Sequence, residues 1–456
     1  MNKIANRAWA AMILAATLFL GLCIIVVRYV RDSEEWYLHH SNSAVYTNGR
    51  LNSGKVYDRS GNLLVDASDG RVYPEDETLR RATLHLLGDV EGNVPDYMMD
   101  HFSNELTAYD LFNGAQSGQG VFMELTVNSQ IQKTAYQALA GRKGTVGVYN
   151  YKTGEILCMV STPGFDPMNP TEVDDSEAYE GAYVNRFLHA SYTPGSVFKV
   201  VTASAAIAEI PDLQERVFHC DGDWVIDGVV VTCSGIHNDI QFDTALTKSC
   251  NVVFAQLAVE LGAETLKAYA EAAGLTKALE FDGFVTAKGD IDLDRVSVNA
   301  LAWAGIGQHT NQINPCQYMT FMGAIANGGV SAKPYVVSRI RCGPEETYRA
   351  APTFNDPMLK QEIADRLAQS MHLAVVNNYG ESNFAGLYAG AKSGTAERGG
   401  DLIPNALFAG FVQDETYPLA FVVVVEGAGS GSQTCVPIVN QVLNSCVTVL
   451  RMEKTS

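Results

Sequence analysis

The longest apolar stretch of the chain lies near its N-terminus and is long enough to cross a membrane. Residues 8–27, AWAAMILAATLFLGLCIIVV, contain no charged side chain. As a helix rising about 1.5 Å per residue, this stretch would cover roughly 30 Å, the thickness of the hydrocarbon core of a bilayer. A cleavable signal peptide is the alternative, but its apolar core is usually shorter, at about 7–15 residues. We therefore expect an uncleaved single-pass anchor within residues 1–30.

The charges that flank this stretch bear on its orientation. Lys3 and Arg7 precede it, and Arg28 and Arg31 follow it. The N-terminal amino group adds a positive charge to the first pair, and the remaining sequence shows no second span. The positive-inside rule therefore predicts a protein of the cell membrane with a cytoplasmic N-terminus and an extracytoplasmic globular part.

Beyond the anchor, the pattern of apolar and polar positions changes at about residue 121. Residues 31–120 are polar and irregular, except that GKVYDRSGNLLVD predicts two short strands joined by a turn. The following segment, VFMELTVNSQIQKTAYQALAG, predicts a strand and then an amphipathic helix, because Ile131, Ala135 and Leu139 recur at helical spacing. We expect a small β-rich module over residues 31–120, serving as a pedestal or in dimerisation, and a main domain over residues 121–456.

Strand patterns occur at both ends of the main domain, with mostly helical sequence between them. GTVGVYNYKTGEILCMVSTP predicts two strands joined by a hairpin turn, and ALFAGFV and PLAFVVVVE predict two more strands after residue 405. A helix over about residues 436–452 follows. Strands that pair around a long helical insertion form one antiparallel sheet flanked by helices, which is an α+β fold.

Net charge excludes one class of function. The chain has 456 residues, with 32 basic and 51 acidic side chains and a net charge of −19. Nucleic-acid binding requires a cluster of basic residues that displaces counterions from phosphates, and no such cluster is present. We therefore expect no nucleic-acid partner.

The stretch YTPGSVFKV contains a candidate nucleophile and base. Ser196 and Lys199 lie three residues apart at a predicted helix start and would project from one face. A serine hydroxyl attacks efficiently once a base takes its proton, and a lysine in a dry pocket can have the lowered pKa that this role needs. A capping serine followed by a surface lysine would give the same four letters, so this motif needs further support.

Two later motifs supply that support. KSCN offers Ser249 and Asn251 as a relay, and AKSGTAE offers a cation, a hydroxyl and a glycine that permits close approach to a strand. Chance matches occur at residues 60–62, 297–299 and 152–154, so the ordered combination carries the argument. The candidate residues of the third motif are Lys392, Ser393, Gly394 and Thr395.

The ordered motifs S-x-x-K, S-x-N and K-[ST]-G resemble the signature of penicillin-binding proteins and serine β-lactamases. GKVYDRSGNLL resembles the R-G-x-I-x-D-R-x-G-x-x-L-A segment of class B penicillin-binding proteins, although Gly54 stands where that family usually has arginine. TGEILCMVSTPGFDPMNP and GIGQ…INPCQYMTFMGAIANGG resemble further landmarks of the family. The likeness covers about residues 50–446 and is greatest to the short proteins of the penicillin-binding protein A type.

The resemblance implies the fold of a penicillin-binding protein transpeptidase domain and a peptidoglycan D,D-transpeptidase activity that β-lactams inhibit. Ser196 would attack the D-Ala-D-Ala carbonyl of a stem peptide, and Lys199 would take its proton. The backbone N–H groups of Ser196 and Thr395 would form the oxyanion hole. By the same resemblance, Ser249 and Asn251 would relay a proton and hold the peptide, while Lys392 and Ser393 would bind the terminal carboxylate.

Other functions compatible with these motifs are a β-lactamase, a D,D-carboxypeptidase and a non-catalytic scaffold of a wall-synthesis complex. A β-lactamase would differ mainly in rapid deacylation, and a scaffold would have no need of a complete set of catalytic residues. The residues between the anchor and residue 121 are too few for a glycosyltransferase domain. The resemblance therefore implies a separate membrane partner, a SEDS-family glycosyltransferase, and no cofactor for catalysis.

Three cysteines and a histidine form the pattern C-x12-C-x3-H-x12-C. Three thiolates and one imidazole would complete a tetrahedral zinc shell, while a Cys220–Cys233 disulfide or free thiols are the alternatives. The resemblance favours zinc at His237 and Cys250, because some elongation-type members hold zinc beside the S-x-N motif. A metal there would brace the loop and take no part in acyl transfer. The full candidate set is Cys220, Cys233, His237 and Cys250.

Overall fold

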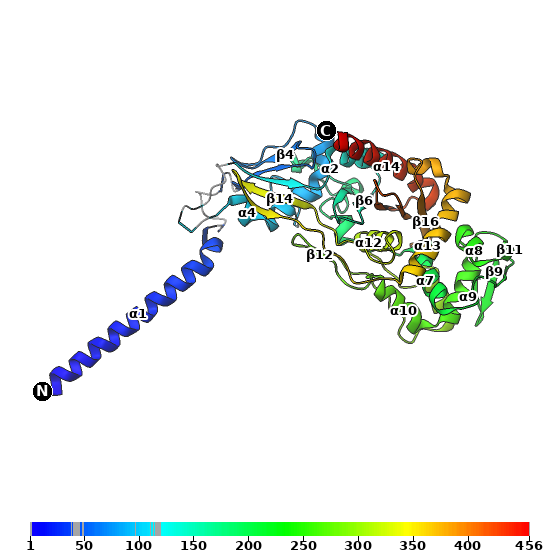
Figure 1. Ribbon diagram of the computed structural model, residues 1–456, viewed down its shortest axis with the longest axis horizontal. Helices are drawn as coiled ribbons and strands as arrows, with labels where there is room; N and C mark the ends of the chain where they lie inside the picture. The colour runs from blue at the N-terminus through cyan, green and yellow to red at the C-terminus, as the bar shows by residue number, and fades with distance from the viewer. Residues whose placement is uncertain are drawn as a thin grey trace.

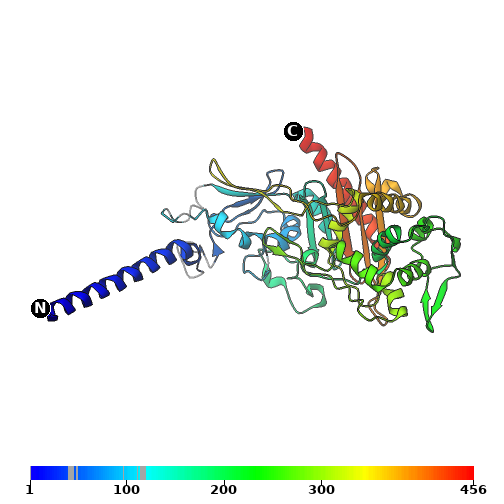
Figure 2. The ribbon, with the colours of Figure 1, turned by 60° about the horizontal axis from the view of Figure 1, so that its bottom comes forward.

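The computed structural model describes residues 2–455 except 38, 40–45, 48–49, 96, 110, 113 and 115–119. Part of the module expected over residues 31–120 therefore lies outside the described residues. Helix α1 (Asn2–Tyr37) projects from one end of the molecule, and the helical part of the main domain lies at the other end (Figures 1 and 2). Within α1, Lys3–Ser33 is apolar and long enough to cross a membrane, and none of its most apolar part is buried. The expected candidate span is confirmed.

The central sheet of the main domain joins strands from its two ends. All of its neighbours are antiparallel, in the order β16-β17-β18-β6-β7. Val423 of β18 lies opposite Val146 of β6, so the early and late parts of the chain meet in the middle of the sheet, as expected. The strands are β6 (Gly144–Asn150), β7 (Ile156–Thr162), β16 (Ala389–Ala396), β17 (Asn405–Val412) and β18 (Leu419–Val425).

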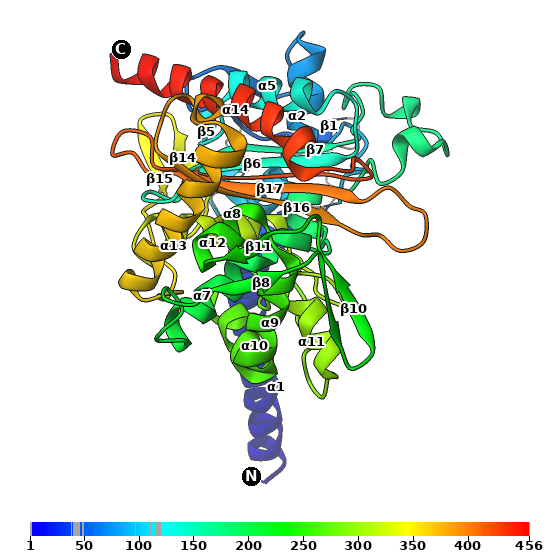
Figure 3. The same ribbon diagram turned by 90° about the vertical axis from the view of Figure 1, so that its right-hand side faces the viewer.

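Helices cover both faces of this sheet, which explains the uninterrupted run of valines in β18. Val422 and Val424 pack on the face covered by α12 (Pro315–Ala326), whereas Val423 and Val425 pack on the face covered by α5 (Ser129–Leu139) and α14 (Gly431–Thr455). Figure 3 shows the strands between these two layers. A strand buried on both faces requires apolar side chains at every position, not only at alternate ones.

Helix α14 begins earlier than the sequence pattern predicts. The sequence pattern predicts a start near residue 436. The structure begins the helix at Gly431, and Pro437 lies inside it. Gly431 lies directly against the central sheet, since a Cβ there would approach the carbonyl oxygen of Gly394 to 2.2 Å. This helix is also long and apolar enough to cross a membrane, but half of its most apolar part is buried in the core.

A second five-stranded sheet lies between the anchor and the central sheet, in the order β15-β14-β5-β3-β4. It contains the predicted hairpin of GKVYDRSGNLL, and β3 runs parallel to β5. Its strands come from both sides of residue 120, so the domain boundary expected there stays a prediction. The strands are β3 (Lys55–Tyr57), β4 (Leu63–Asp66), β5 (Val121–Leu125), β14 (Val337–Cys342) and β15 (Glu345–Arg349).

Close approach of the backbone explains the glycine at the position where the resembled family usually has arginine. A Cβ on Gly54 would lie 2.6 Å from the carbonyl oxygen of Val121, at the start of β5. Real Cβ atoms do not approach an oxygen so closely, and a glycine lets the two segments meet.

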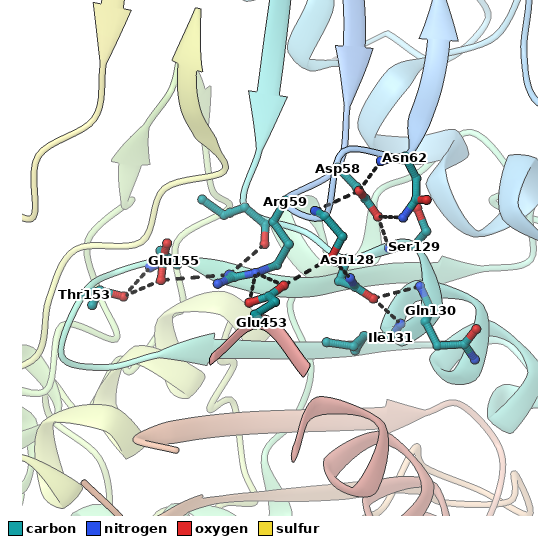
Figure 4. A network of polar contacts seen from close by, with 12 residues as sticks. Asp58, Arg59, Asn62, Asn128, Ser129, Gln130, Ile131, Thr153, Glu155 and Glu453 are labelled. Carbon is teal, nitrogen blue, oxygen red and sulfur yellow. Dashed lines mark hydrogen bonds and ion pairs between the residues drawn. The ribbon is translucent and has the colours of Figure 1, made fainter. Parts of the chain in front are cut away.

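The turn after β3 connects the second sheet to the main domain (Figure 4). The buried carboxylate of Asp58 accepts hydrogen bonds from the backbone N–H groups of Ser60, Asn62 and Ser129 at 2.8–2.9 Å. Because Ser129 is the first residue of α5, the carboxylate also lies at a helix N-terminus, where negative charge is favourable. Arg59 binds Glu453 near the C-terminal end of α14 at 2.9 Å, so this turn fixes both helices that cover one face of the central sheet.

The remaining elements of the main domain surround the cleft or lie near it. Those that position functional side chains are described with the site below. The other helices are α6 (Arg186–His189), α8 (Phe242–Lys248), α10 (Ala263–Ala272), α11 (Val298–Gly305) and α13 (Gln361–Ala374), and the other strands are β8 (Phe218–Cys220), β9 (Asp223–Ile226), β10 (Val229–Thr232), β11 (Asn238–Ile240), β12 (Glu280–Phe281) and β13 (Phe284–Val285). Nearer the anchor are α2 (Glu77–Leu87), α3 (Met98–His101), α4 (Ser103–Thr107), β1 (Tyr46–Thr47) and β2 (Arg50–Leu51).

Candidate active site

The candidate nucleophile lies on a short 3₁₀ turn that leads directly into a helix. The turn is η4 (Gly195–Phe198), and α7 (Lys199–Glu209) follows it without a break. In 3₁₀ geometry, residues three apart lie above one another, so Ser196 and Lys199 face the same side. The Nζ atom of Lys199 lies 3.1 Å from the Oγ atom of Ser196, as the spacing predicts.

Close contacts with three other segments fix this turn. Gly195 has a φ of 54° and donates its N–H to the carbonyl oxygen of Gly307 at 2.8 Å. A Cβ on Gly307 would lie 1.9 Å from the carbonyl oxygen of Gly195, and a Cβ on Gly195 would lie 2.5 Å from that of Thr395. The buried hydroxyl of Tyr318 donates to the carbonyl oxygen of Val197 at 2.7 Å. The GIGQ and INPCQYM segments therefore act as direct supports of the turn.

Lys199 is completely buried, and oxygen atoms surround its amine. Nζ lies 2.6 Å from the carbonyl oxygen of Ser249, 3.1 Å from its Oγ atom, and 2.6 Å from Oδ1 of Asn251. Burial lowers the pKa of Lys199 to about 7. A substantial fraction of neutral amine, the form that can accept a proton, is therefore present at neutral pH.

Ser249 lies between two buried lysines. It is the residue that ends α8, with a left-handed backbone (φ 55°), and only Cys250 separates it from α9 (Asn251–Leu261). Its Oγ atom lies 2.9 Å from Nζ of Lys392, in addition to its contact with Lys199. Burial, and then the charge of Lys199, lower the pKa of Lys392 well below its usual value. A hydroxyl in contact with two such amines can pass a proton between them.

Strand β16 forms the other wall of the cleft. It is the edge strand of the central sheet, and Lys392 to Thr395 lie on it. A Cβ on Gly394 would lie 2.7 Å from the carbonyl oxygen of Pro194, so the glycine lets the strand lie directly against the nucleophile turn. A cavity of about 480 Å³ opens here; among its lining residues are Ser196, Ser249, Asn251, Ser393 and Thr395.

The structure therefore brings all three motifs into one cleft and leaves the chance matches outside it. Ser297 caps helix α11, Lys152 pairs with Glu415 in the predicted hairpin turn, and Ser60 lies in the turn after β3. Six other residues that line the cavity were not named as candidates in the sequence analysis. Ile306 and Gln308 belong to the GIGQ segment and Glu397 ends the AKSGTAE segment, so these three could have been found from those segments. No pattern indicates the remaining three, which are Thr232, Ser234 and Trp303.

The cysteine and histidine cluster forms directly beside the second motif. The Nδ1 atom of His237 lies 3.5 Å from Sγ of Cys220 and 3.6 Å from Sγ of Cys233. The Sγ atoms of Cys233 and Cys250 lie 3.8 Å apart. In a tetrahedron with Zn–S bonds of about 2.3 Å, ligand atoms lie roughly 3.8 Å apart, so the four residues fit a zinc shell. All nine cysteines lie among the described residues, and none of them is paired in this structure.

Comparisons with known proteins agree on one family. The family described as penicillin binding protein transpeptidase domain matches residues 144–444. The peptidoglycan D,D-transpeptidase PbpA of Mycolicibacterium smegmatis is 28% identical over 350 residues, which cover 70% of each chain. Penicillin-binding protein A of M. tuberculosis, solved as a penicillin G acyl-enzyme complex, has a TM-score of 0.76 and 24% identity over 87% of this chain and 99% of that one. A D,D-transpeptidase domain from Eggerthella lenta has a TM-score of 0.74 and 26% identity over 87% and 98%.

The contact between Gly307 and the nucleophile turn gives a prediction for stability. We expect Gly307→Ala to reduce the free energy of unfolding by more than about 3 kcal/mol, because it adds a clash to the strain of a positive φ. Gly141→Ala is the matched control, since Gly141 has a φ of 75° and open space around it, and we expect a loss of about 1 kcal/mol. Denaturant unfolding of the detergent-solubilised protein measures both losses, and equal losses would contradict the proposed support.

Proposed function

Because the chain belongs to the family of penicillin-binding protein transpeptidase domains, we propose that it is a class B peptidoglycan D,D-transpeptidase of the penicillin-binding protein A type. The observation that carries this proposal is the buried amine of Lys199, 3.1 Å from the Ser196 hydroxyl and in contact with Ser249. This arrangement suits an acyl transfer that starts from a serine and needs no cofactor. The substrates are peptidoglycan stem peptides, and β-lactams react with the same serine.

The acylation step follows from the positions of these groups. The Oγ atom of Ser196 forms a bond to the penultimate D-Ala carbonyl carbon, and its proton moves to the neutral Nζ of Lys199. The N–H groups of Ser196 and Thr395 stabilise the oxyanion that forms. The peptide bond then breaks, and the leaving D-Ala amine receives a proton from Lys199 through the Ser249 hydroxyl. An ester between Ser196 and the shortened peptide remains.

A second amine completes the cross-link. The amine of a neighbouring stem peptide attacks the ester carbonyl and gives up its proton to the Lys199 and Ser249 pair. The new peptide bond forms, the ester bond breaks, and Ser196 regains its proton. Lys392 and Ser393 bind the terminal carboxylate of the donor peptide in the first step, and Asn251 holds the peptide backbone. A complete set of these groups would have no use in a scaffold.

We also propose that Cys220, Cys233, His237 and Cys250 hold a structural zinc ion. The N–H of Asn251 lies 3.2 Å from Sγ of Cys233, and its side-chain amide donates to the carbonyl oxygen of Thr232 at 2.8 Å. The cluster therefore holds the loop that carries Ser249 and Asn251. Zinc would cross-link β8, the segment after β10, and the loop before α9, without contact with the reacting atoms.

Two further proposals concern the surroundings of the protein. Helix α1 anchors the chain in the cell membrane with the N-terminus in the cytoplasm, which places the cleft outside it. A SEDS-family glycosyltransferase in the same membrane supplies the glycan strands whose stem peptides this protein joins. Helices α7 and α9, which carry Lys199 and Asn251, lie toward the end of the molecule opposite to α1, and this arrangement fits a reaction that takes place away from the membrane surface (Figure 1).

The first prediction from the proposed function concerns the nucleophile. We expect a fluorescent penicillin to label the full-length protein with one adduct of long lifetime, and Ser196→Ala to abolish labelling while the melting temperature stays within a few degrees. Intact mass spectrometry and gel fluorescence measure the adduct. Rapid loss of the adduct would favour a β-lactamase, and absence of labelling in folded protein would favour a scaffold.

The second prediction concerns pH. Since Lys199 must be neutral to accept the Ser196 proton and its pKa is about 7, we expect the acylation rate to rise roughly tenfold per unit below pH 7 and to level off above it. Stopped-time labelling between about pH 5.5 and 8.5 measures this profile. A rate independent of pH over this range would exclude Lys199 as the base.

The third prediction concerns the metal. We expect the purified protein to contain about one zinc ion per chain by elemental analysis, and Cys233→Ser to remove most of it. Cys342→Ser is the control, because Cys342 is a half-buried free cysteine of β14 outside the cluster. Zinc-free protein with a Cys220–Cys233 disulfide, or with free thiols, would refute the proposed site.

A further inference from the structure

The segment after α13 contains an uncommon helical turn. Helix α13 continues into η5 (Val375–Tyr379), a π-helical turn in which the N–H of Gly380 bonds to the carbonyl oxygen of Val375 at 2.8 Å. A π turn holds one residue more than an α turn and is seldom formed without a reason, often at functional sites. Here it brings Asn378 and Tyr379 to two different motifs of the cleft.

Tyr379 contacts the third motif through its hydroxyl group. The side chain is buried, and its ring packs edge-on against Phe408 of β17, with the ring centres 5.0 Å apart. The hydroxyl oxygen lies 3.0 Å from the backbone nitrogen of Ser393 and 2.9 Å from its Oγ atom. Both polar groups of Ser393 that could meet a ligand are therefore in contact with one tyrosine.

The chemistry of the groups sets the direction of these hydrogen bonds. A backbone N–H can only donate, so the Tyr379 oxygen accepts from Ser393. The Tyr379 proton must then go to an acceptor, because buried hydroxyl groups rarely lack a partner. Among the described residues, the Oγ atom of Ser393 is the acceptor in contact with it. The proton of Ser393 is therefore left to point elsewhere, into the cleft that Ser393 lines.

Tyr379 also closes part of the free edge of the central sheet. Ser393 lies opposite Phe408 in the pairing of β16 with β17, and its N–H points away from β17 to Tyr379. In an antiparallel strand, the next N–H on the same edge belongs to the residue two positions on, which is Thr395. The open edge therefore starts at Thr395, beside the nucleophile turn.

Asn378 ties the same turn to the second motif. Its side-chain amide donates to the carbonyl oxygen of Thr247, in the last turn of α8 and two residues before Ser249. Helix α13 itself packs against β16, α8 and α7 (Figure 1). The π turn thus holds the wall with Ser393 and the wall with Ser249 at a fixed separation.

We propose that Tyr379 is a positioning residue that presents the Ser393 hydroxyl as a hydrogen-bond donor to the terminal carboxylate of the donor peptide. The inference rests on the proposed function, in which Ser393 binds that carboxylate. Without the Tyr379 hydroxyl, the Ser393 proton is free to rotate, and its N–H is left without a partner at the edge of the sheet. Substrates that carry the carboxylate lose most from this change.

The test compares two acylating agents in the full-length, detergent-solubilised protein. For Tyr379→Phe, we expect the second-order rate of acylation by benzylpenicillin to fall about tenfold, the effect of one ordinary hydrogen bond. Its methyl ester, which lacks the negative carboxylate, should react less than twofold more slowly than with the wild type. In a Ser393→Ala background, Tyr379→Phe should cause little further loss, because the two residues act as one unit.

The matched control is Tyr388→Phe. Tyr388 lies on the same connection, partly exposed, with its ring stacked on His372, and we expect no change with either compound. An equal loss with both compounds, together with a lower melting temperature, would reduce Tyr379 to a structural role and overturn the inference. An unchanged rate with benzylpenicillin would overturn it as well. A wild-type protein that forms no adduct would refute the proposed function, and with it this inference.

Discussion

The burial of one lysine amine is the constraint on which the candidate site depends. Moving an ammonium group out of water costs several kcal/mol unless oxygen atoms replace the lost water. Around Lys199 these oxygen atoms come from Ser196 on the nucleophile turn and from Ser249 and Asn251 at the junction of α8 and α9. Each segment is held in turn by the glycine contacts, the cysteine and histidine cluster, or strand β16. The first two sequence motifs thus form the shell around the buried amine, and the third joins it through the contact of Lys392 with the Ser249 hydroxyl.

Features that depend on local pattern could be predicted from the sequence. The apolar runs predicted four of the five strands of the central sheet, because both faces of these strands are buried, whereas the edge strand β16 has no such run. The spacing of Ile131, Ala135 and Leu139 predicted helix α5, because these side chains are buried on one side. Features that depend on distant pairing could not. No local signal shows that β14 joins the second sheet, or that a π turn brings Tyr379 to Ser393. A proline usually ends a helix, and α14 includes Pro437 nonetheless.

The second sheet gives the molecule its length. It separates the anchor helix from the central sheet, and the buried Asp58 carboxylate fixes its turn to the start of α5 (Figures 1 and 4). Arg59 adds a contact with Glu453 near the end of the chain. Helices α7 and α9, which carry residues of the cleft, lie toward the end of the molecule opposite to α1, so the second sheet separates Ser196 from the candidate membrane span (Figure 1).

The strand order of the central sheet also has a consequence for biogenesis. β18 lies between β17 and β6, and it ends at Val425, close to the end of a chain of 456 residues. The sheet therefore depends on contacts between segments far apart in the chain, which form late and slowly during folding. Until β18 is in place, the hairpin of β16 and β17 is not joined to β6, and the wall of the cleft that carries the third motif is not fixed. The reactivity of the serine therefore depends on a strand that carries none of the three motifs.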